Sequence, residues 1–180
     1  HTWVVDADLK SYFDTIPFDP LIMRVEGKVS DGAVIAMLRA YLRQKVMDGM
    51  EQWTPEGGTP QGAVISPLLS NIYLDPLDHE MAQRGREMVR YADDFVILCQ
   101  SQAEAEAALE QVRQWTADAG LQLHPVKTRI VDATQKGGFD FLGYHFERGM
   151  KWPRQKSLKK FKDTIRAKTK RTNGQSLQTI

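Results

Sequence analysis

The most informative segment of the chain is Met88-Val89-Arg90-Tyr91-Ala92-Asp93-Asp94-Phe95-Val96-Ile97-Leu98-Cys99. Two short apolar runs flank a pair of aspartates, which is the pattern of two strands joined by a tight turn. Adjacent carboxylates repel one another unless a cation lies between them and their partner groups. Because hard divalent cations prefer oxygen ligands, Asp93 and Asp94 are candidate metal ligands. The dipeptide alone is also compatible with an ordinary solvated turn.

A third acid, Asp8, stands in a matching position near the start of the chain. Residues 3–9 read Trp-Val-Val-Asp-Ala-Asp-Leu, and their alternation predicts a strand. The period of two places Asp6 and Asp8 on one face of that strand. The sequence therefore predicts a carboxylate at the end of a first strand in addition to the pair at the hairpin.

Composition indicates one globular domain. The chain has 180 residues, is 42% hydrophobic and has a single cysteine, so it has no internal disulfide and fits a reducing compartment. We expect a cytoplasmic protein. No apolar run approaches the roughly 18 residues of a membrane span, so no membrane partner is expected. The chain enters a strand almost at once and has no initiator methionine, which suggests an excised fragment.

The net charge of +1 conceals an asymmetry. Residues 145–180 contain eleven Lys and Arg against two acids, a net +9, which leaves −8 on residues 1–144. A basic segment joined to an acidic body is a candidate contact for a polyanion, although a charge run is often only a solvated face.

The periodicity predicts an α+β fold in which helices cover one face of a sheet. We expect one helix to begin with Asp19 as its N-cap, Pro76 to kink or break another, and Arg148-Gly149 to form a turn. The predicted helices are 31–44, 63–84, 102–119 and a basic helix 157–170, and the predicted strands and hairpins are 3–9, 45–53, 88–99, 121–123, 128–131 and 139–146.

Two loops between these elements carry candidate binding residues. Residues 55–62 read Pro-Glu-Gly-Gly-Thr-Pro-Gln-Gly, and glycines let a ligand approach the backbone while Pro60 can hold Gln61 in one pose. A purely structural turn is the alternative. Lys127 is either an exposed loop cation or a side chain that points toward a ligand.

In combination, these parts resemble the palm of reverse transcriptases, and within them the group II intron-encoded type. The resemblance spans nearly the whole chain in the family's order, and five ordered motifs make coincidence improbable. The motifs are Asp8-Leu9-Lys10-Ser11-Tyr12-Phe13-Asp14, the run from Gly58-Thr59-Pro60-Gln61-Gly62 to Asp78, Tyr91-Ala92-Asp93-Asp94, Lys127-Thr128 and Phe141-Leu142-Gly143. One departure is Ala63, where many group II enzymes have a glycine.

The resemblance implies a ferredoxin-like antiparallel sheet and a two-metal nucleotidyl transfer to a primer 3′ end. The expected cofactor is a pair of Mg²⁺ ions, for which Mn²⁺ could substitute. The expected metal ligands are Asp8 and Asp93, which would bridge the ions, with Asp94 as a less direct ligand and the Leu9 carbonyl as an extra one.

The resemblance also assigns substrate contacts. Phe13 would lie under the sugar of the incoming nucleotide and exclude a 2′-hydroxyl, and Lys127 would be a proton donor to pyrophosphate. The nucleotide and template site would include Leu9, Phe13, Pro60, Gln61 and Gly62, and the primer grip would be Phe141, Leu142 and Gly143. The implied partners are an RNA template, a DNA primer, dNTPs and, for the full-length protein, an intron RNA.

By the same resemblance, residues 1–147 are a palm without fingers, and residues 148–180 are the primer-grip end and the start of a basic thumb helix. We expect the isolated chain to be weakly active or inactive as a polymerase and to bind nucleic acid weakly and with strong salt dependence. Two alternatives stay open. One is an RNA-binding maturase-like module that assists splicing, against which the three intact carboxylates argue. The other is a CRISPR-associated, retron or diversity-generating reverse transcriptase.

Overall fold

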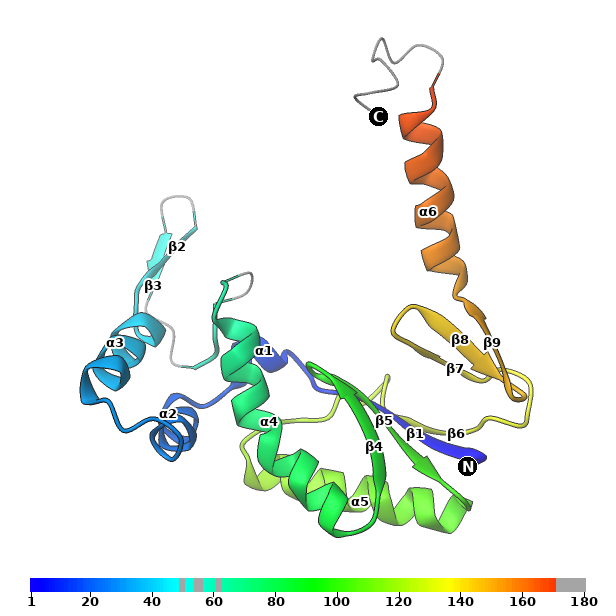
Figure 1. The fold of residues 1–180 in the computed structure, drawn as a ribbon, viewed down its shortest axis with the longest axis horizontal. Coiled ribbons are helices and arrows are strands. Elements are labelled where there is room, and N and C mark those ends of the chain that lie inside the picture. The colour runs from blue at the N-terminus through cyan, green and yellow to red at the C-terminus, as the bar shows by residue number, and fades with distance from the viewer. Residues whose placement is uncertain (49–50, 54–56, 61–62, 171–180) are drawn as a thin grey trace. The chain divides into compact units, whose positions relative to one another are not determined.

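The computed structural model describes residues 1–48, 51–53, 57–60 and 63–170, and it has the predicted α+β character (Figure 1). Two compact units divide the chain between Ile130 and Val131. The palm boundary expected at residue 147 lies inside the second unit.

The first unit is built on a sheet of four strands, the last of which runs two residues past the end of this unit. These are β1 (Trp3–Asp8), β4 (Glu87–Tyr91), β5 (Asp94–Cys99) and β6 (Arg129–Asp132), in the order β4-β5-β1-β6. β5 pairs antiparallel with both β1 and β4. This strand order, with α4 (Ser66–Gln83) leading into β4 and α5 (Gln102–Asp118) connecting β5 to β6, is the ferredoxin-like arrangement that was predicted, and further small elements are inserted between β1 and α4.

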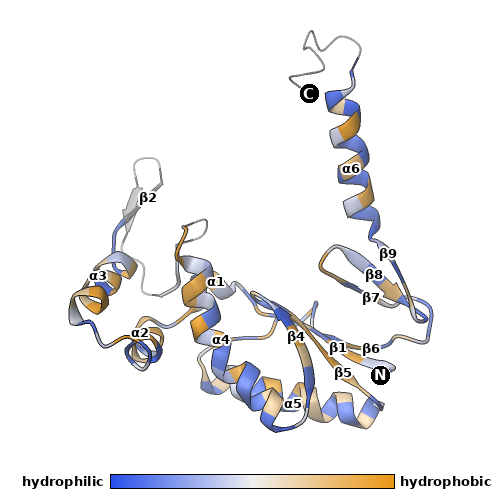
Figure 2. Cartoon of the chain, in the orientation of Figure 1, coloured by the Kyte–Doolittle hydropathy of each residue, from blue (hydrophilic) through white to orange (hydrophobic). Residues whose placement is uncertain are grey.

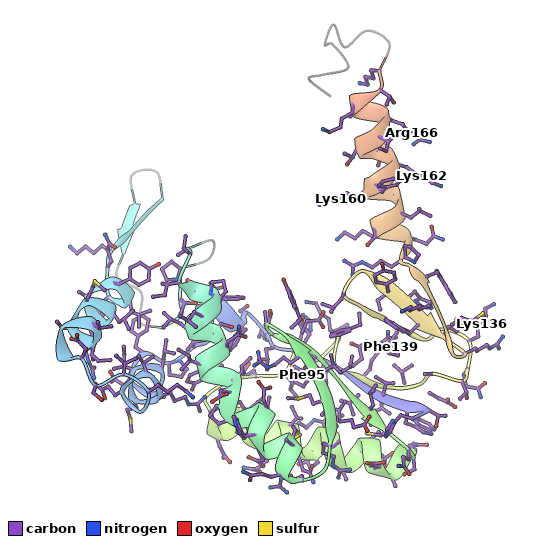
Figure 3. The ribbon with its side chains drawn as sticks, in the orientation of Figure 1. Phe95, Lys136, Phe139, Lys160, Lys162 and Arg166 are labelled. Carbon is purple, nitrogen blue, oxygen red and sulfur yellow. The ribbon has the colours of Figure 1, made fainter. Side chains whose placement is uncertain are left out.

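The two long helices α4 and α5 contribute to the core on one face of this sheet. In α4 the buried residues recur every fourth position, so one stripe of the helix is apolar. That stripe is Leu69, Tyr73, Leu77 and Met81, all at most 1% exposed. From the sheet, β5 turns Phe95, Ile97 and Cys99 into the same core (Figure 3 labels Phe95). The predicted packing of helices on one face is confirmed.

Smaller elements complete the first unit. They are the helices α1 (Tyr12–Thr15), α2 (Phe18–Glu26) and α3 (Gly32–Leu42) and the antiparallel pair β2 (Val46–Asp48) and β3 (Glu51–Trp53). Asp31 caps α3, because its carboxylate accepts hydrogen bonds from the backbone N–H groups of Ala33 and Val34.

The second unit contains a three-stranded antiparallel sheet and one helix. The strands are β7 (Phe139–Phe141), β8 (Tyr144–Glu147) and β9 (Met150–Pro153), in that order. The helix is α6 (Gln155–Lys168), which has no buried residue and in which hydrophilic and hydrophobic residues are interspersed (Figure 2). No helix in the described part of the chain is both long and apolar enough to cross a bilayer.

Several local predictions were wrong. The helix α2 begins at Phe18 after Pro17, so Asp19 is not its N-cap. Pro76 lies inside α4 and does not break it, because the helix continues to Gln83; a kink at Pro76 stays a prediction. The strand expected at 121–123 is reduced to a single bridge between Leu9 and Leu123.

The single strand expected at 139–146 was wrong as well: the structure has two strands there, because the chain turns at Leu142 and Gly143. Both of these residues have positive φ. By contrast, the predicted turn at Arg148 and Gly149, which also have positive φ, is confirmed between β8 and β9.

Candidate active site

The register of the central strands places two of the predicted carboxylates opposite each other. Asp8 at the end of β1 pairs with Asp94 at the start of β5. Directly opposed residues of an antiparallel pair project from the same face, with Cβ atoms about 4.5–5.5 Å apart. Neighbouring Ala7 and Phe95 point into the core on the other face. The alternation that buries the core therefore also turns Asp8 and Asp94 away from the helices.

Asp93 lies in the two-residue turn between β4 and β5. Ala92, the first residue of this turn, has a φ of 55°, whereas Asp93 is not among the positive-φ residues, which is the sign pattern of a type II′ turn. An alanine in this region costs about 1–3 kcal/mol. Such strain persists only where the surrounding structure holds it.

The carboxyl of Asp93 is partly buried, and the removal of water raises its pKa, with a further increase from the negative charge of Asp8. Asp8 and Asp93 also line the same cavity. Two carboxylates that share a site attract a cation.

Lys127 supplies such a cation in the structure. Its Nζ donates to Asp8 Oδ2 at 2.8 Å, and this contact, together with the charges of Asp8, Asp93 and Asp94, raises the pKa of the lysine. The loop is fixed to the end of β1, because the His124 N–H donates to the Asp8 carbonyl at 2.8 Å. The structure thus brings Lys127 to the predicted site from 119 residues away.

The carbonyl of Leu9 faces the same side as the acidic turn. Leu9 and Leu123 are paired, but the two backbone hydrogen bonds of this bridge are made by the residues on either side of them. The Lys10 N–H donates to the Gln122 carbonyl, and the His124 N–H donates to the Asp8 carbonyl. In an antiparallel bridge of this type the paired residue itself points its N–H and C=O outward. Since β5 is the other neighbour of β1, the Leu9 carbonyl is directed toward β5.

A cavity of about 390 Å³ joins these groups. This size falls within the range of small-molecule sites, about 300–1,000 Å³. Its lining consists of Asp8, Leu9, Lys10, Ser11, Tyr12, Phe13, Asp93, His124 and Lys127. Lys10, Ser11, Tyr12 and His124 were not predicted as site residues. The first three lie inside the motif from Asp8 to Asp14, whereas no pattern in the sequence distinguishes His124 from an ordinary loop residue.

The donor set is suited to a divalent cation, but it is not a preassembled cage. Asp8 and Asp93 offer carboxylates in one cavity, and the Leu9 carbonyl can add a third oxygen. Within the residues that the structure describes, no group of three or more Asp, Glu, His or Cys side chains is placed to hold a metal ion. The ligand role of Asp94 therefore stays a prediction.

Lys127 competes with a metal for Asp8. We expect Lys127→Gln to raise the affinity for Mn²⁺ about two- to fivefold, which corresponds to the free energy of a typical exposed ion pair. In this variant the metal ion no longer has to displace the ammonium group from Asp8. Titration of free Mn²⁺ by electron paramagnetic resonance measures this. Lys28→Gln is the matched control, since Lys28 forms a similar exposed pair with Asp75 at 3.1 Å outside the site. Unchanged or weaker binding in Lys127→Gln would contradict the competition.

The glycine-bearing loop is attached to the segment that follows β1. The Gly58 N–H donates to the Ile16 carbonyl at 2.8 Å, and the Thr59 N–H donates to the Phe13 carbonyl at 2.6 Å. Pro60 is exposed, and its carbonyl accepts a hydrogen bond from Ser66 Oγ at 2.7 Å. The predicted site residues Gln61 and Gly62 lie outside the described residues.

The predicted primer-grip residues lie in the second unit. Phe141 ends β7 and is buried, whereas Leu142 is half exposed in the turn that leads to β8. The positive φ of Gly143 and the close approach of Ser157 Oγ favour glycine at that position. These three residues therefore form the tip of a hairpin.

Comparison with known proteins identifies the family. The model of the family described as "Reverse transcriptase (RNA-dependent DNA polymerase)" matches residues 1–146. The chain belongs to the reverse transcriptase family. Members of this family generally use divalent metal ions and act on nucleic acids.

Curated relatives of this reverse transcriptase include Protein YkfC of Escherichia coli (strain K12), which is 34% identical over 81% of the chain and 47% of YkfC. Another is the group II intron-encoded protein LtrA of Lactococcus lactis subsp. cremoris, which is 35% identical over 45% of the chain and 14% of LtrA. The chain thus spans about half or less of the length of these relatives. The resemblance to group II intron-encoded reverse transcriptases that the motifs indicated is confirmed.

A solved structure confirms the fold class of this reverse transcriptase chain. The structure of apo telomerase from Candida Tropicalis, truncated from its C-terminal domain, superposes with a TM-score of 0.69 over 84% of the chain and 35% of the telomerase chain. The sequences are only 12% identical. This similarity therefore concerns the fold alone.

Proposed function

We propose that the chain is the palm of a group II intron-type RNA-directed DNA polymerase, which adds deoxynucleotides to the 3′ end of a primer. The observation that carries this proposal is the convergence of Asp8 and Asp93 in one cavity at the end of the central strands. Residues 1–147 would be the palm, and residues 148–180 the primer-grip end and the start of a basic thumb helix.

The carboxylates of Asp8 and Asp93, with the Leu9 carbonyl and Asp94, would hold two Mg²⁺ ions. When bound, the metal lowers the pKa of the primer hydroxyl and stabilises charge on the leaving pyrophosphate. Lys127 is placed to lose its pairing with Asp8 as the metal binds, and its ammonium could then donate a proton to the pyrophosphate. The residues themselves orient the reactants and concentrate charge where the reaction needs it.

The basic helix of the second unit would bind the phosphates of the template and primer. Lys160, Lys162 and Arg166 project from α6 (Figure 3), and every residue of this helix is at least partly accessible. Such cations bind phosphates without reading sequence, and salt weakens the contact. An RNA template, a DNA primer and, for a longer protein, an intron RNA are the partners that fit this charge distribution.

Primer extension on an RNA template with Mg²⁺ and dNTPs tests the proposal. The chain is assayed beside a version that includes any encoded flanking residues. We expect extension by the longer version and weak or no extension by the chain alone. If the longer version is inert but binds structured RNA, the maturase-like alternative is favoured instead.

Phe13 gives a test of product identity. Its ring lines the cavity beside Asp8 and packs edge-on against Tyr12, with ring centroids 5.5 Å apart. We expect Phe13→Ala to reduce the preference for dNTPs over rNTPs by about 10–100-fold, because the truncated side chain would leave room for a 2′-hydroxyl. The measurement is kcat/KM for each nucleotide.

Phe18→Ala is the control for this test, since Phe18 packs against the core outside that cavity. An equal ratio of kcat/KM for dNTPs over rNTPs in the wild type and Phe13→Ala would show that Phe13 does not exclude the 2′-hydroxyl.

A further inference from the structure

The guanidinium of Arg90 connects the acidic turn to helix α4. Its Nη1 donates to the Ala92 carbonyl at 2.9 Å and to Asn71 Oδ1 at 3.0 Å, and its Nε donates to Asp78 Oδ1 at 2.7 Å. Nη2 also binds Asp78, through Oδ2. One side chain therefore joins two positions of α4 to the residue immediately before Asp93.

These contacts form a rigid support. The Arg90 side chain is only 10% exposed, and its bidentate pairing with Asp78 fixes the plane of the guanidinium. The hydrogen bond to Asp78 raises the pKa of Arg90 above its usual value, so the group stays charged. Asn71 and Asp78 lie on the same face of α4, two helical turns apart, and Arg90 contacts both.

Arg90 binds the residue of the turn whose backbone is strained. Ala92 has a positive φ, which only glycine adopts without strain, and its carbonyl is the group that Arg90 binds. Arg90 itself points toward the helices, because strand residues alternate and Tyr91 is exposed on the other face. Arg90 is therefore held in place without contact with the cavity that contains Asp8 and Asp93.

We propose that Arg90 is a positioning residue for the metal site: anchored by Asn71 and Asp78, it holds the Ala92 carbonyl and thereby the orientation of Asp93. This role also explains why polar side chains occur at two sites of α4 that do not reach the cavity. The kinetic part of the inference rests on the proposed polymerase function, whereas the metal-binding part does not.

Arg90→Lys is the decisive variant. A lysine keeps the charge beside Asp78 but cannot donate simultaneously to Asp78, Asn71 and Ala92. We expect Mn²⁺ affinity to fall about tenfold or more, as for other partners that orient a metal ligand. In the longer version of the protein, kcat for primer extension should fall by a similar factor, while KM for dNTP should change less.

Arg86→Lys is the matched control. Arg86 immediately precedes β4, is 15% exposed at its side chain and pairs with Glu104 at 2.9 Å and with Gln111 at 3.3 Å. Its partners are on α5, and it has no contact with the turn. Thermal unfolding should show similar losses of stability for both arginine variants, whereas Mn²⁺ binding should change only in Arg90→Lys.

Two further variants make the test independent of folding. Asn71→Ala removes one anchor and should reduce Mn²⁺ affinity less than Arg90→Lys does. Ala92→Gly removes the φ penalty and should restore part of the binding lost in Arg90→Lys. Equal Mn²⁺ affinity in Arg90→Lys and Arg86→Lys would overturn the inference. If Arg90→Lys does not fold, an Mn²⁺ affinity in Asn71→Ala equal to that of the wild type would overturn it instead. Inactivity of the longer version with the wild-type sequence would refute the polymerase proposal and leave the metal-binding result interpretable.

Discussion

Asp93→Asn, made in the longer version of the protein, should reduce templated nucleotide addition on the order of a thousandfold while leaving the fold intact. The amide keeps the shape of the side chain but removes the charge that the metal requires. Binding of Mn²⁺ should fall in parallel, which gives a readout that does not depend on polymerase activity.

Stability should respond in the opposite direction. Burial and the charge of Asp8 raise the pKa of Asp93 in the folded chain. A raised carboxyl pKa contributes stability below the unfolded-state pKa, and this contribution is lost as the pH rises through the folded-state pKa. At neutral pH the ionised group therefore opposes folding, and Asp93→Asn should be at least as stable as the wild type.

Asp118→Asn is the control for both measurements, because Asp118 ends α5 and does not line the cavity. Strong polymerase activity in Asp93→Asn would contradict the assignment of Asp93. A marked loss of stability at neutral pH would contradict the electrostatic argument.

Gly58→Ala should destabilise the first unit by about 2–5 kcal/mol, which combines a left-handed backbone with overpacking. Gly58 has a φ of +89°, and a Cβ there would lie 2.6 Å from the Phe13 carbonyl oxygen and 2.9 Å from the Asp14 backbone. The atoms in the way belong to the main chain, so they cannot rotate aside. The displacement would also move Phe13, which lines the cavity.

Gly85→Ala separates the two causes. Gly85 also has a positive φ, +68°, but a methyl group at this position would have nothing within 4 Å of it. We expect a loss of about 1–2 kcal/mol from the backbone conformation alone. Urea unfolding of both variants measures the difference. Equal losses would mean that the loop does not approach the Phe13 segment as closely as described.

The hairpin and the first strand could be predicted because a period of two is local information. Alternation in residues 3–9 and 88–99 predicted which side chains enter the core, whereas the pairing of Asp8 with Asp94 depends on the register between two distant strands and came from the structure. The turn at Leu142 was missed because apolar and aromatic residues recur on both sides of it, from Phe139 to Phe146, and the pattern contains no sign of its φ of 48°.

Long-range contacts were beyond the sequence pattern. Lys127 could be a loop cation or a site residue until the fold brought it to Asp8. Likewise, Arg90 looked like an ordinary strand residue, because its partners are on a helix that precedes it in the chain. In both cases packing of distant elements decides which charges meet, and residue spacing does not encode that.

The single cysteine of the chain lies at the opposite end of β5 from the acidic turn. Cys99 is fully buried, pairs in register with Trp3, and has a thiol pKa that burial raises. A thiol-modifying reagent can reach this sulfur only when the elements packed around the end of β5 open. The rate at which Cys99 becomes labelled therefore measures how often the structure opens around the strand that carries the acidic turn. This measurement needs no substitution in the protein and no nucleotide.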